Sequence, residues 1–282
     1  MRAAVVGHVE WVELARVDSL PAPGQIVHAT ASWGVPGGGG AVTAVQLARL
    51  AGGARFFTAL GDDELGHRAH DELTALGLQV HPVWRPEPQR RAFVHLDATG
   101  ERTITVIGAR MGPSGDDDLP WELLDHADAV YVTAGDPAAL RQARQAKRLV
   151  GTARVLETLR DAEIGLDALV ASSSDEGERY RAGDLDPAPD LVILTAGEEG
   201  GRWERPATGG SGAWQAVEPP GPPVDAYGCG DSFAGGVTYG LGAGMEPQRA
   251  LELGARCGAF CAAGAGPYES QLRSVQGTSP GD

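Results

Sequence analysis

The chain has 282 residues, 42% of them hydrophobic, which is enough for one large α/β domain carrying a small appendage. Its formal net charge of −15 argues against nucleic-acid binding, which requires clustered Lys and Arg, but it leaves a nucleotide site open. No charged leader with an apolar core is visible, and no apolar run reaches the roughly 18 residues that cross a bilayer. We therefore expect a cytoplasmic protein that binds no membrane.

Short apolar strands alternate with helices along most of the chain. "AAVVG" (3–7) and "ARFFTALG" (54–61) are typical of buried strands. Between them, "AVTAVQLARLAGG" (41–53) has apolar residues at helical spacing and a glycine stop. The same rhythm resumes at "HADAVYVTAGD" (126–136) and continues to two C-terminal helices. This alternation predicts an α/β fold with a mostly parallel sheet covered by helices on both faces.

Two segments do not fit that rhythm. The first, within about 10–35, contains an alternating strand after a Pro/Gly turn. The second, "RAFVHLDATGERTITVI" (91–107), has two alternating stretches around a central turn and predicts a β-hairpin. We expect residues 1–282 to form a single domain in which the ranges 10–35 and 90–108 make a small β lid.

The stretch "VDAYGCGDSFAGG" (224–236) places glycines directly before an expected helix. Unpaired N–H groups at a helix start, here after Gly228, Cys229 and Gly230, can bind phosphate oxygens. Two interpretations of Asp231 follow from the residues. It can be the N-cap of the helix, or it can accept a proton from a hydroxyl that attacks a phosphate.

Four segments together resemble the ribokinase-like carbohydrate kinases, also called the phosphofructokinase B (PfkB) family. "PPVDAYGCGDSFAGG" is similar to the family's C-terminal signature, D-T-x-G-A-G-D-x-F. "PGGGGAVTAVQLARLAGGARFFTALGDDELG" resembles its N-terminal signature, G-G-K-G-A-N followed by a helix, a strand and a turn. "GERTI" matches a hairpin of the family's lid, and "LTAGEEGG" matches its T-x-G-x-x-G nucleotide loop. The four segments occur in the family's order.

The resemblance implies a ribokinase-like three-layer fold and ATP-dependent phosphorylation of a hydroxyl on a sugar or sugar-like molecule. It makes Asp231 the general base and gives Gly228, Cys229 and Gly230 the role of an anion hole. Mg²⁺ is expected to bridge the β- and γ-phosphates of ATP. The nucleotide is expected at the loop that contains Thr195, Gly197 and Gly200.

The expected substrate residues depart from the family pattern. In the segment that begins at Gly38, the family's lysine is Gly39 and its asparagine is Val42, and both positions usually contact the sugar. Losing two polar groups predicts weaker recognition of a polyol. Glu10 is the candidate for hydroxyl binding, with a solvated strand-end carboxylate as the alternative. Asp136 is a candidate substrate contact or else the N-cap of a helix that begins at Pro137.

The expected metal residues also differ. The family's N-x-x-E motif reads "ASSSDEGE" here, so the resemblance implies Asp175 or Glu176 as a Mg²⁺ residue, and an acidic loop is the alternative. Asp225 and "GAGPYES" (264–270) resemble the parts of a site for a monovalent cation such as K⁺.

Several alternatives stay open from the sequence. Gly39 and Val42 leave an apolar site that would admit a nucleoside, and a sensor that binds metabolite without catalysis is a further possibility. Arg90, Arg91 and Arg102 lie on or beside the predicted hairpin, where they either bind an existing substrate phosphate or only face solvent. The lid is also expected to pair two copies into a homodimer.

Overall fold

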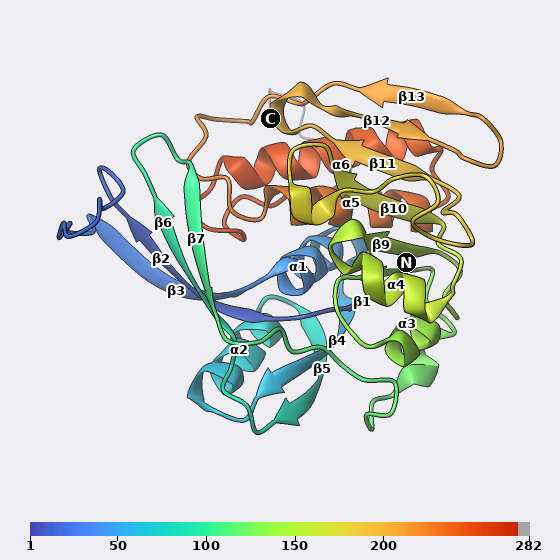
Figure 1. Ribbon diagram of the computed structural model, residues 1–282, viewed down its shortest axis with the longest axis horizontal. Coiled ribbons are helices and arrows are strands. Elements are labelled where there is room, and N and C mark those ends of the chain that lie inside the picture. Colours follow the sequence, from blue (N-terminus) through green and yellow to red (C-terminus); the bar gives the residue numbers. More distant parts are fainter. Residues whose placement is uncertain (276–282) are drawn as a thin grey trace.

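The computed structural model describes residues 1–275, so the last seven residues of the expected domain lie outside it. Among these residues, nine strands form one sheet (Figure 1). In sheet order the strands are β13 (Ser211–Trp214), β12 (Gly201–Glu204), β11 (Val192–Thr195), β10 (Ala168–Ser172), β9 (Leu149–Thr152), β8 (Ala129–Val132), β1 (Ala3–Val6), β4 (Ala54–Gly61) and β5 (Leu78–Arg85). All neighbours from β11 to β5 run parallel.

Helices cover both faces of this sheet, as predicted. Alternate residues of β1 show why: Ala3 and Val5 belong to one buried cluster, and Ala4 and Val6 belong to another. The first cluster is covered by α1 (Gly39–Ala51), α2 (Glu64–Ala75), α5 (Cys229–Gly242) and α6 (Pro247–Ala262). The second is covered by η1 (Trp121–Leu124), α3 (Pro137–Ala143) and α4 (Leu156–Ala162).

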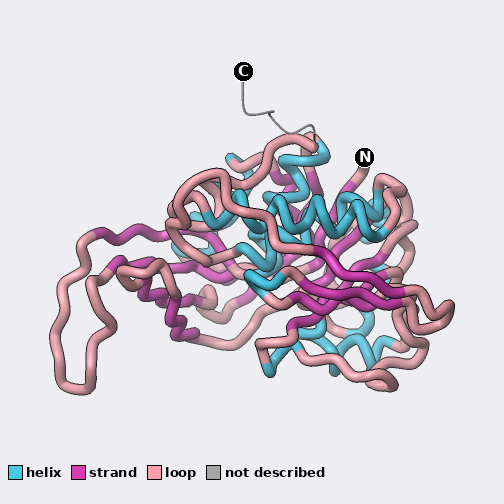
Figure 2. The backbone as a smooth tube through the Cα atoms, turned by 90° about the horizontal axis from the view of Figure 1, so that it is seen from above, coloured by secondary structure: helices cyan, strands magenta, loops and turns pink. Residues whose placement is uncertain are grey.

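A second, smaller sheet extends from one side of the molecule (Figure 2). Its order is β3 (Ala31–Gly37), β2 (Glu10–Arg16), β6 (Arg91–Leu96) and β7 (Arg102–Ile107). The predicted hairpin is confirmed, because β6 and β7 pair antiparallel. The two expected lid segments lie together because β2 pairs with β6, and this central pair is parallel. The connection from β2 to β3 reaches furthest from the body (Figure 2).

One part of the sheet was not predicted. After β11 the chain turns back as β12 and then β13, and both pair antiparallel. These strands have only four residues each and contain glycines at 201 and 212, so they carry little of the apolar alternation by which a strand is found. No helix among the described residues has the length and apolar character to cross a membrane.

The parallel strands bring distant loops to one edge. The carboxyl ends of neighbouring parallel strands meet at the same side of a sheet, where open α/β folds bind their ligands. At this edge lie the segments that follow β1, β8, β9, β10 and β11. Short helical turns lie in three of them: η2 (Ala153–Val155), η3 (Glu176–Glu178) and η4 (Gly197–Glu199).

Candidate active site

The turn before α5 presents free backbone donors. Gly228 is the N-cap residue with φ 86°, in the left-handed region, and no side chain caps the helix. A Cβ at Gly228 would lie 2.9 Å from Pro267 Cβ and 3.0 Å from Val42 Cγ1, so only glycine fits. The N–H groups of Gly230 and Asp231 donate to no group among residues 1–275. Open space surrounds Gly230, so these donors can receive an anion.

Asp231 lies in the first turn of α5, beyond the N-cap, so it is not the capping residue. Its side chain is half-buried, and its carboxylate makes no hydrogen bond or ion pair with a described residue. Burial, and next the charge of Glu178, raise the pKa of Asp231 to about 7, although Arg154 and Arg102 oppose this. A carboxylate with a pKa near neutrality and no partner is suited to general-base chemistry.

The start of α1 faces Asp231 and keeps space open beside it. Gly38 is the N-cap of α1 with φ 84°, and Tyr227 holds it by accepting a hydrogen bond of 3.0 Å from the Gly38 N–H at its hydroxyl. A Cβ at Gly39 would lie 2.9 Å from Asp231 Oδ1 and 3.7 Å from His8 Cε1. Glycine at position 39 therefore leaves the approach to the Asp231 carboxylate free.

His8 and Glu10 form a polar group on the lid side of this space. Glu10 Oε1 lies 2.7 Å from Arg90 Nε and 3.8 Å from His8 Nε2. His8 Nδ1 lies 3.4 Å from the hydroxyl of Thr133. Burial, followed by the charges of Arg110, Arg90 and Arg154, lowers the pKa of His8 to about 3. The imidazole is therefore neutral, and it is held among positive charges.

A comparison of the sequence with known families gives one match over nearly the whole chain. The profile of the pfkB family carbohydrate kinases matches residues 2–273. The chain belongs to this family. An ATP-dependent ribose-1-phosphate kinase from Halopiger xanaduensis (strain DSM 18323 / JCM 14033 / SH-6) is 27% identical, over 93% of this chain and 92% of that protein. The predicted family membership is confirmed.

Solved structures give the same fold. A putative ribokinase from Agrobacterium tumefaciens matches with a TM-score of 0.80 at 21% identity, over 96% of this chain and 94% of that one. The ribokinase of Arabidopsis thaliana complexed with ribose and ATP matches with a TM-score of 0.74 at 18% identity, over 96% of each chain. These likenesses confirm the ribokinase-like fold, and the profile places the pfkB chain among carbohydrate kinases.

The expected nucleotide loop of this pfkB protein follows β11. Thr195 ends the strand, and its hydroxyl donates to the carbonyl of Ala171 at 3.2 Å. Gly197 and Gly200 both have positive φ, 57° and 83°. A Cβ at Gly200 would lie 2.2 Å from the carbonyl oxygen of Trp214, so this glycine lets β13 pack closely against the loop.

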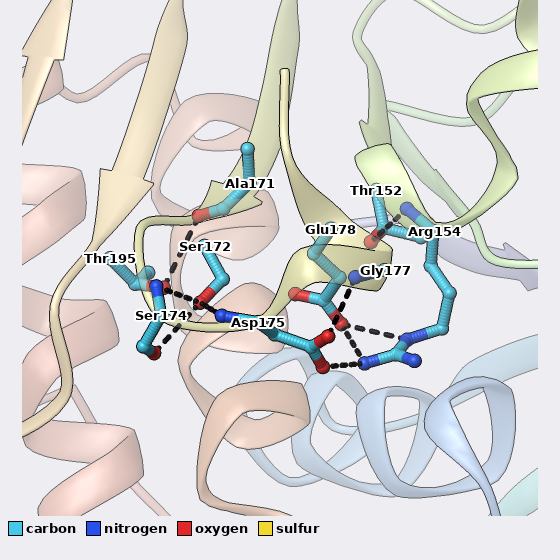
Figure 3. A network of polar contacts seen from close by, with 9 residues as sticks. All are labelled: Thr152, Arg154, Ala171, Ser172, Ser174, Asp175, Gly177, Glu178 and Thr195. Carbon is cyan, nitrogen blue, oxygen red and sulfur yellow. Dashed lines mark hydrogen bonds and ion pairs between the residues drawn. The ribbon is translucent and has the colours of Figure 1, made fainter.

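The acidic segment after β10 is tied to Arg154 (Figure 3). Arg154 Nη2 lies 2.7 Å from Asp175 Oδ2, and Arg154 Nε lies 2.7 Å from Glu178 Oε1. The Glu176 side chain is 84% exposed and pairs with Arg179 at 3.4 Å. Within residues 1–275, no three His, Cys, Asp or Glu side chains gather to hold a metal ion.

Asp225 joins the turn before α5 to the late loop that the sequence paired with it. Its carboxylate accepts hydrogen bonds from the N–H groups of Tyr227 at 2.8 Å and Gly266 at 2.6 Å. Burial raises the pKa of Asp225 against these two hydrogen bonds. Both carboxylate oxygens therefore stabilise the loop, and each keeps lone pairs that a cation can use.

Two expected substrate residues have structural roles. Val42 is fully buried against Gly228, so it offers the substrate no surface, and the prediction of a substrate contact there is corrected. Asp136 is the N-cap of α3, accepting from the Ala139 N–H at 2.8 Å. It also accepts from the Ser114 hydroxyl at 2.6 Å, and these hydrogen bonds lower its pKa against the effect of burial.

Sequence reasoning missed three site residues: His8, Arg154 and Glu178. His8 directly follows the end of β1, a position that could have marked it. Nothing in the sequence pairs Arg154 with Glu178, because their ion pair joins segments that follow two different strands.

Proposed function

We propose that this protein is an ATP-dependent kinase that phosphorylates a hydroxyl group of a sugar or sugar-like molecule. The observation that supports it most is the Asp231 carboxylate, which has no partner among residues 1–275 and lies in the first turn of α5 beside the free N–H groups. A carboxylate at an anion-binding site can remove the proton of a hydroxyl that attacks a bound phosphate. Membership of the pfkB family supports the same reaction.

In the proposed reaction, Asp231 takes the proton of the acceptor hydroxyl as its oxygen attacks the γ-phosphorus of ATP. The bond between the γ-phosphorus and the β,γ-bridging oxygen breaks, and ADP leaves. The turn at Gly228, Cys229 and Gly230 directs the free N–H groups of Gly230 and Asp231 at the transferred phosphoryl oxygens, which stabilises their charge. Because these donors are already oriented by α5, no rearrangement is needed at the reacting step.

The remaining residues have proposed binding roles. Gly38 and Gly39 form the floor of the acceptor site, and Glu10 accepts from a substrate hydroxyl while it pairs with Arg90. Asp136 lies at the carboxyl end of β8, at the same edge of the sheet as these residues. Thr195, Gly197 and Gly200 receive the nucleotide.

Metal ions are also part of the proposal. Magnesium bound with ATP would supply positive charge to the β- and γ-phosphates. Asp175 and Glu176 remain candidates to orient its water ligands from the loop after β10. Asp225 with loop 264–270 is the candidate for a monovalent cation such as K⁺.

The overall arrangement is proposed as one domain over residues 1–282, with the smaller sheet as a lid over the acceptor. We also propose that β7 pairs two copies into a homodimer, because all six of its residues are exposed.

The test is ADP release with ATP and magnesium across pentoses, hexoses, phosphosugars, polyols and nucleosides, with Asp231→Asn beside the native chain. We expect turnover on at least one acceptor, reduced roughly 100- to 10,000-fold in the variant, as expected for loss of a general base. ATP affinity should be unchanged. Acceptor binding without turnover in the native chain would instead support a sensor, and turnover of nucleosides alone would support a nucleoside kinase.

A further inference from the structure

A cavity rich in arginine is lined by Ala134, the residue that follows Thr133, whose hydroxyl contacts His8. It measures about 640 Å³ and is lined by residues from the segments 110–114, 134–136, 153–160 and 176–179. Four of its lining residues are arginines: Arg110, Arg154, Arg160 and Arg179. In a chain with 38 acidic and 23 basic residues, such a concentration of guanidinium groups is unexpected. Arginine clusters of this kind bind phosphate groups bidentately.

Three acids, Asp136, Glu157 and Glu176, share the wall of this cavity with the four arginines. Glu157 is exposed and forms no ion pair with a described residue. Asp136 is engaged by hydrogen bonds from Ser114, Gly115 and Ala139. The Glu176 side chain is largely exposed and forms an ion pair with Arg179 at 3.4 Å. Arg110 forms no hydrogen bond or ion pair with any residue among 1–275.

The acidic partners of Arg154 orient its guanidinium but leave one of its nitrogens free to donate. Asp175 and Glu178 accept from Nη2 and Nε, whereas Nη1 donates to no described residue (Figure 3). A guanidinium fixed in this way is preorganised, so it loses little conformational freedom when it binds an anion.

The charges of these arginines reach the proposed reaction centre. Arg110 and Arg154 both lower the pKa of His8, whose ring borders the space beside Asp231. Partial desolvation, and then the charges of Arg90 and Arg154, also lower the pKa of Arg110. Like charges held this close repel one another, and an anion between them relieves that repulsion.

The nucleotide is a poorer occupant of this cavity than the acceptor. The residues that line the cavity follow β8, β9 and β10, or precede β8. None of them comes from the Thr195–Gly200 loop. The turn before α5, which is the proposed γ-phosphate site, is also absent from the lining.

Resting on the function proposed above, we infer that the acceptor is a sugar that already carries a phosphate monoester, and that Arg110 and Arg154 bind this phosphate in this cavity. A pocket of this volume is within the range that holds a small ligand. The sugar would then lie between the cavity and Asp231, with one hydroxyl beside the carboxylate.

The first test compares phosphosugars with their unphosphorylated parents, using ADP release with pentose and hexose phosphates. We expect kcat/KM to favour the phosphorylated acceptor. In Arg110→Ala this preference should fall roughly 10- to 100-fold, mainly through KM, because one charged hydrogen-bond partner is lost. Arg110→Lys should restore part of it. The matched control is Arg2→Ala. Arg2 is exposed and directly precedes β1, at the amino ends of the parallel strands, whereas the proposed site lies at their carboxyl ends.

The second test separates failure of this inference from failure of the proposed reaction. Calorimetry of phosphosugar binding, without ATP, to the native chain and to Arg110→Ala needs no turnover. Weaker binding in Arg110→Ala, with native binding in Arg2→Ala, supports the phosphate site even if no acceptor is turned over.

Three results would overturn the inference and leave the kinase standing: equal turnover of parent and phosphosugar, an unchanged preference in Arg110→Ala, or a loss of ATP affinity alone in that variant. The last result would assign the arginines to the nucleotide phosphates.

Discussion

At the scale of single residues, two glycines and one aspartate define the candidate site. Gly228 takes a backbone conformation that opens the start of α5, and Gly39 removes a side chain from in front of Asp231. The carboxylate between them has no partner among residues 1–275. Its chemistry is therefore set by burial and by the surrounding charges, which can be tested by pH and by substitution.

The first residue-scale prediction concerns pH. Because burial and Glu178 raise the pKa of Asp231 to about 7, the base is protonated and inactive at lower pH. We expect kcat/KM to rise with pH through an apparent pKa near 7 and then to level off. The measurement is kcat/KM for the best acceptor from pH 5.5 to 9. A flat profile below pH 7 would contradict a base with this pKa.

The second concerns stability. An aspartate with a folded pKa of about 7 instead of 3.8 binds more protons when folded than when unfolded. Its contribution to stability is thus complete below pH about 3.8 and is lost as pH rises to about 7. Asp231→Asn should therefore raise Tm at pH 8, and this gain should shrink towards pH 5. Thermal unfolding at both values tests this, and an equal gain at both would speak against the raised pKa.

The third concerns Gly39. In Gly39→Ala the new Cβ would lie 2.9 Å from Asp231 Oδ1, in the space proposed for the acceptor hydroxyl. The new methyl group should displace the acceptor hydroxyl from Asp231 and lower kcat/KM roughly 100-fold. Gly221→Ala is the matched control, because nothing lies within 4 Å of its Cβ. If steady-state kinetics found native activity in Gly39→Ala, the proposed acceptor position would be wrong.

At the scale of elements, the small sheet is connected to the turn before α5. Arg102, the first residue of β7, donates to the carbonyl of Ala226 at 3.0 Å, and Gly100 packs against Val224. Tyr268 donates to the carbonyl of Pro36 in β3 at 2.6 Å. These contacts join both edge strands of the sheet to the loops beside Asp231.

The prediction at this scale is that Arg102→Ala changes both the lid and the base. Its guanidinium is one of the charges that lower the pKa of Asp231, so its loss should move the apparent pKa of the kcat/KM profile upward. The KM of the acceptor should rise as well, because the hairpin loses a hydrogen bond to the turn. Arg91→Ala, on the neighbouring strand, controls for loss of a lid arginine. An unmoved profile in Arg102→Ala would separate the lid from the base.

At the scale of the whole molecule, β7 leaves an open sheet edge with apolar residues on it. Ile104 is 41% exposed, Val106 45% and Ile107 44%. Exposed apolar edge strands are normally covered, which supports the proposed pairing of two lids.

We expect native protein at micromolar concentration to have about twice the chain mass of 29.2 kDa by light scattering. Val106→Asp should shift it to the monomer, because a charge would be buried in the interface. Thr105→Asp changes the other face of the same strand and should have a smaller effect. A native monomer at these concentrations would refute the lid dimer.

The fold was largely predictable because its signals are local. Apolar strands, helix periods and glycine turns follow one another along the chain, and they gave the parallel sheet, the helices on both faces and the hairpin. The antiparallel strands β12 and β13 were not predicted, because four-residue strands that contain glycine show no clear alternation of apolar residues. The parallel pairing of β2 with β6 was not predicted, because it joins segments roughly 80 residues apart in the sequence.

By itself, the sequence determined the family, the turn at Gly228–Gly230 and the position of Asp231, because each of these depends on neighbours along the chain. The tertiary structure decided which side chains share the site. It buried Val42 behind the turn, used Asp136 as a helix cap, and brought His8, Arg154 and Glu178 towards Asp231. Charges act through space, whereas motifs are read along the chain, so the basic cavity at Arg110 is visible only in the fold.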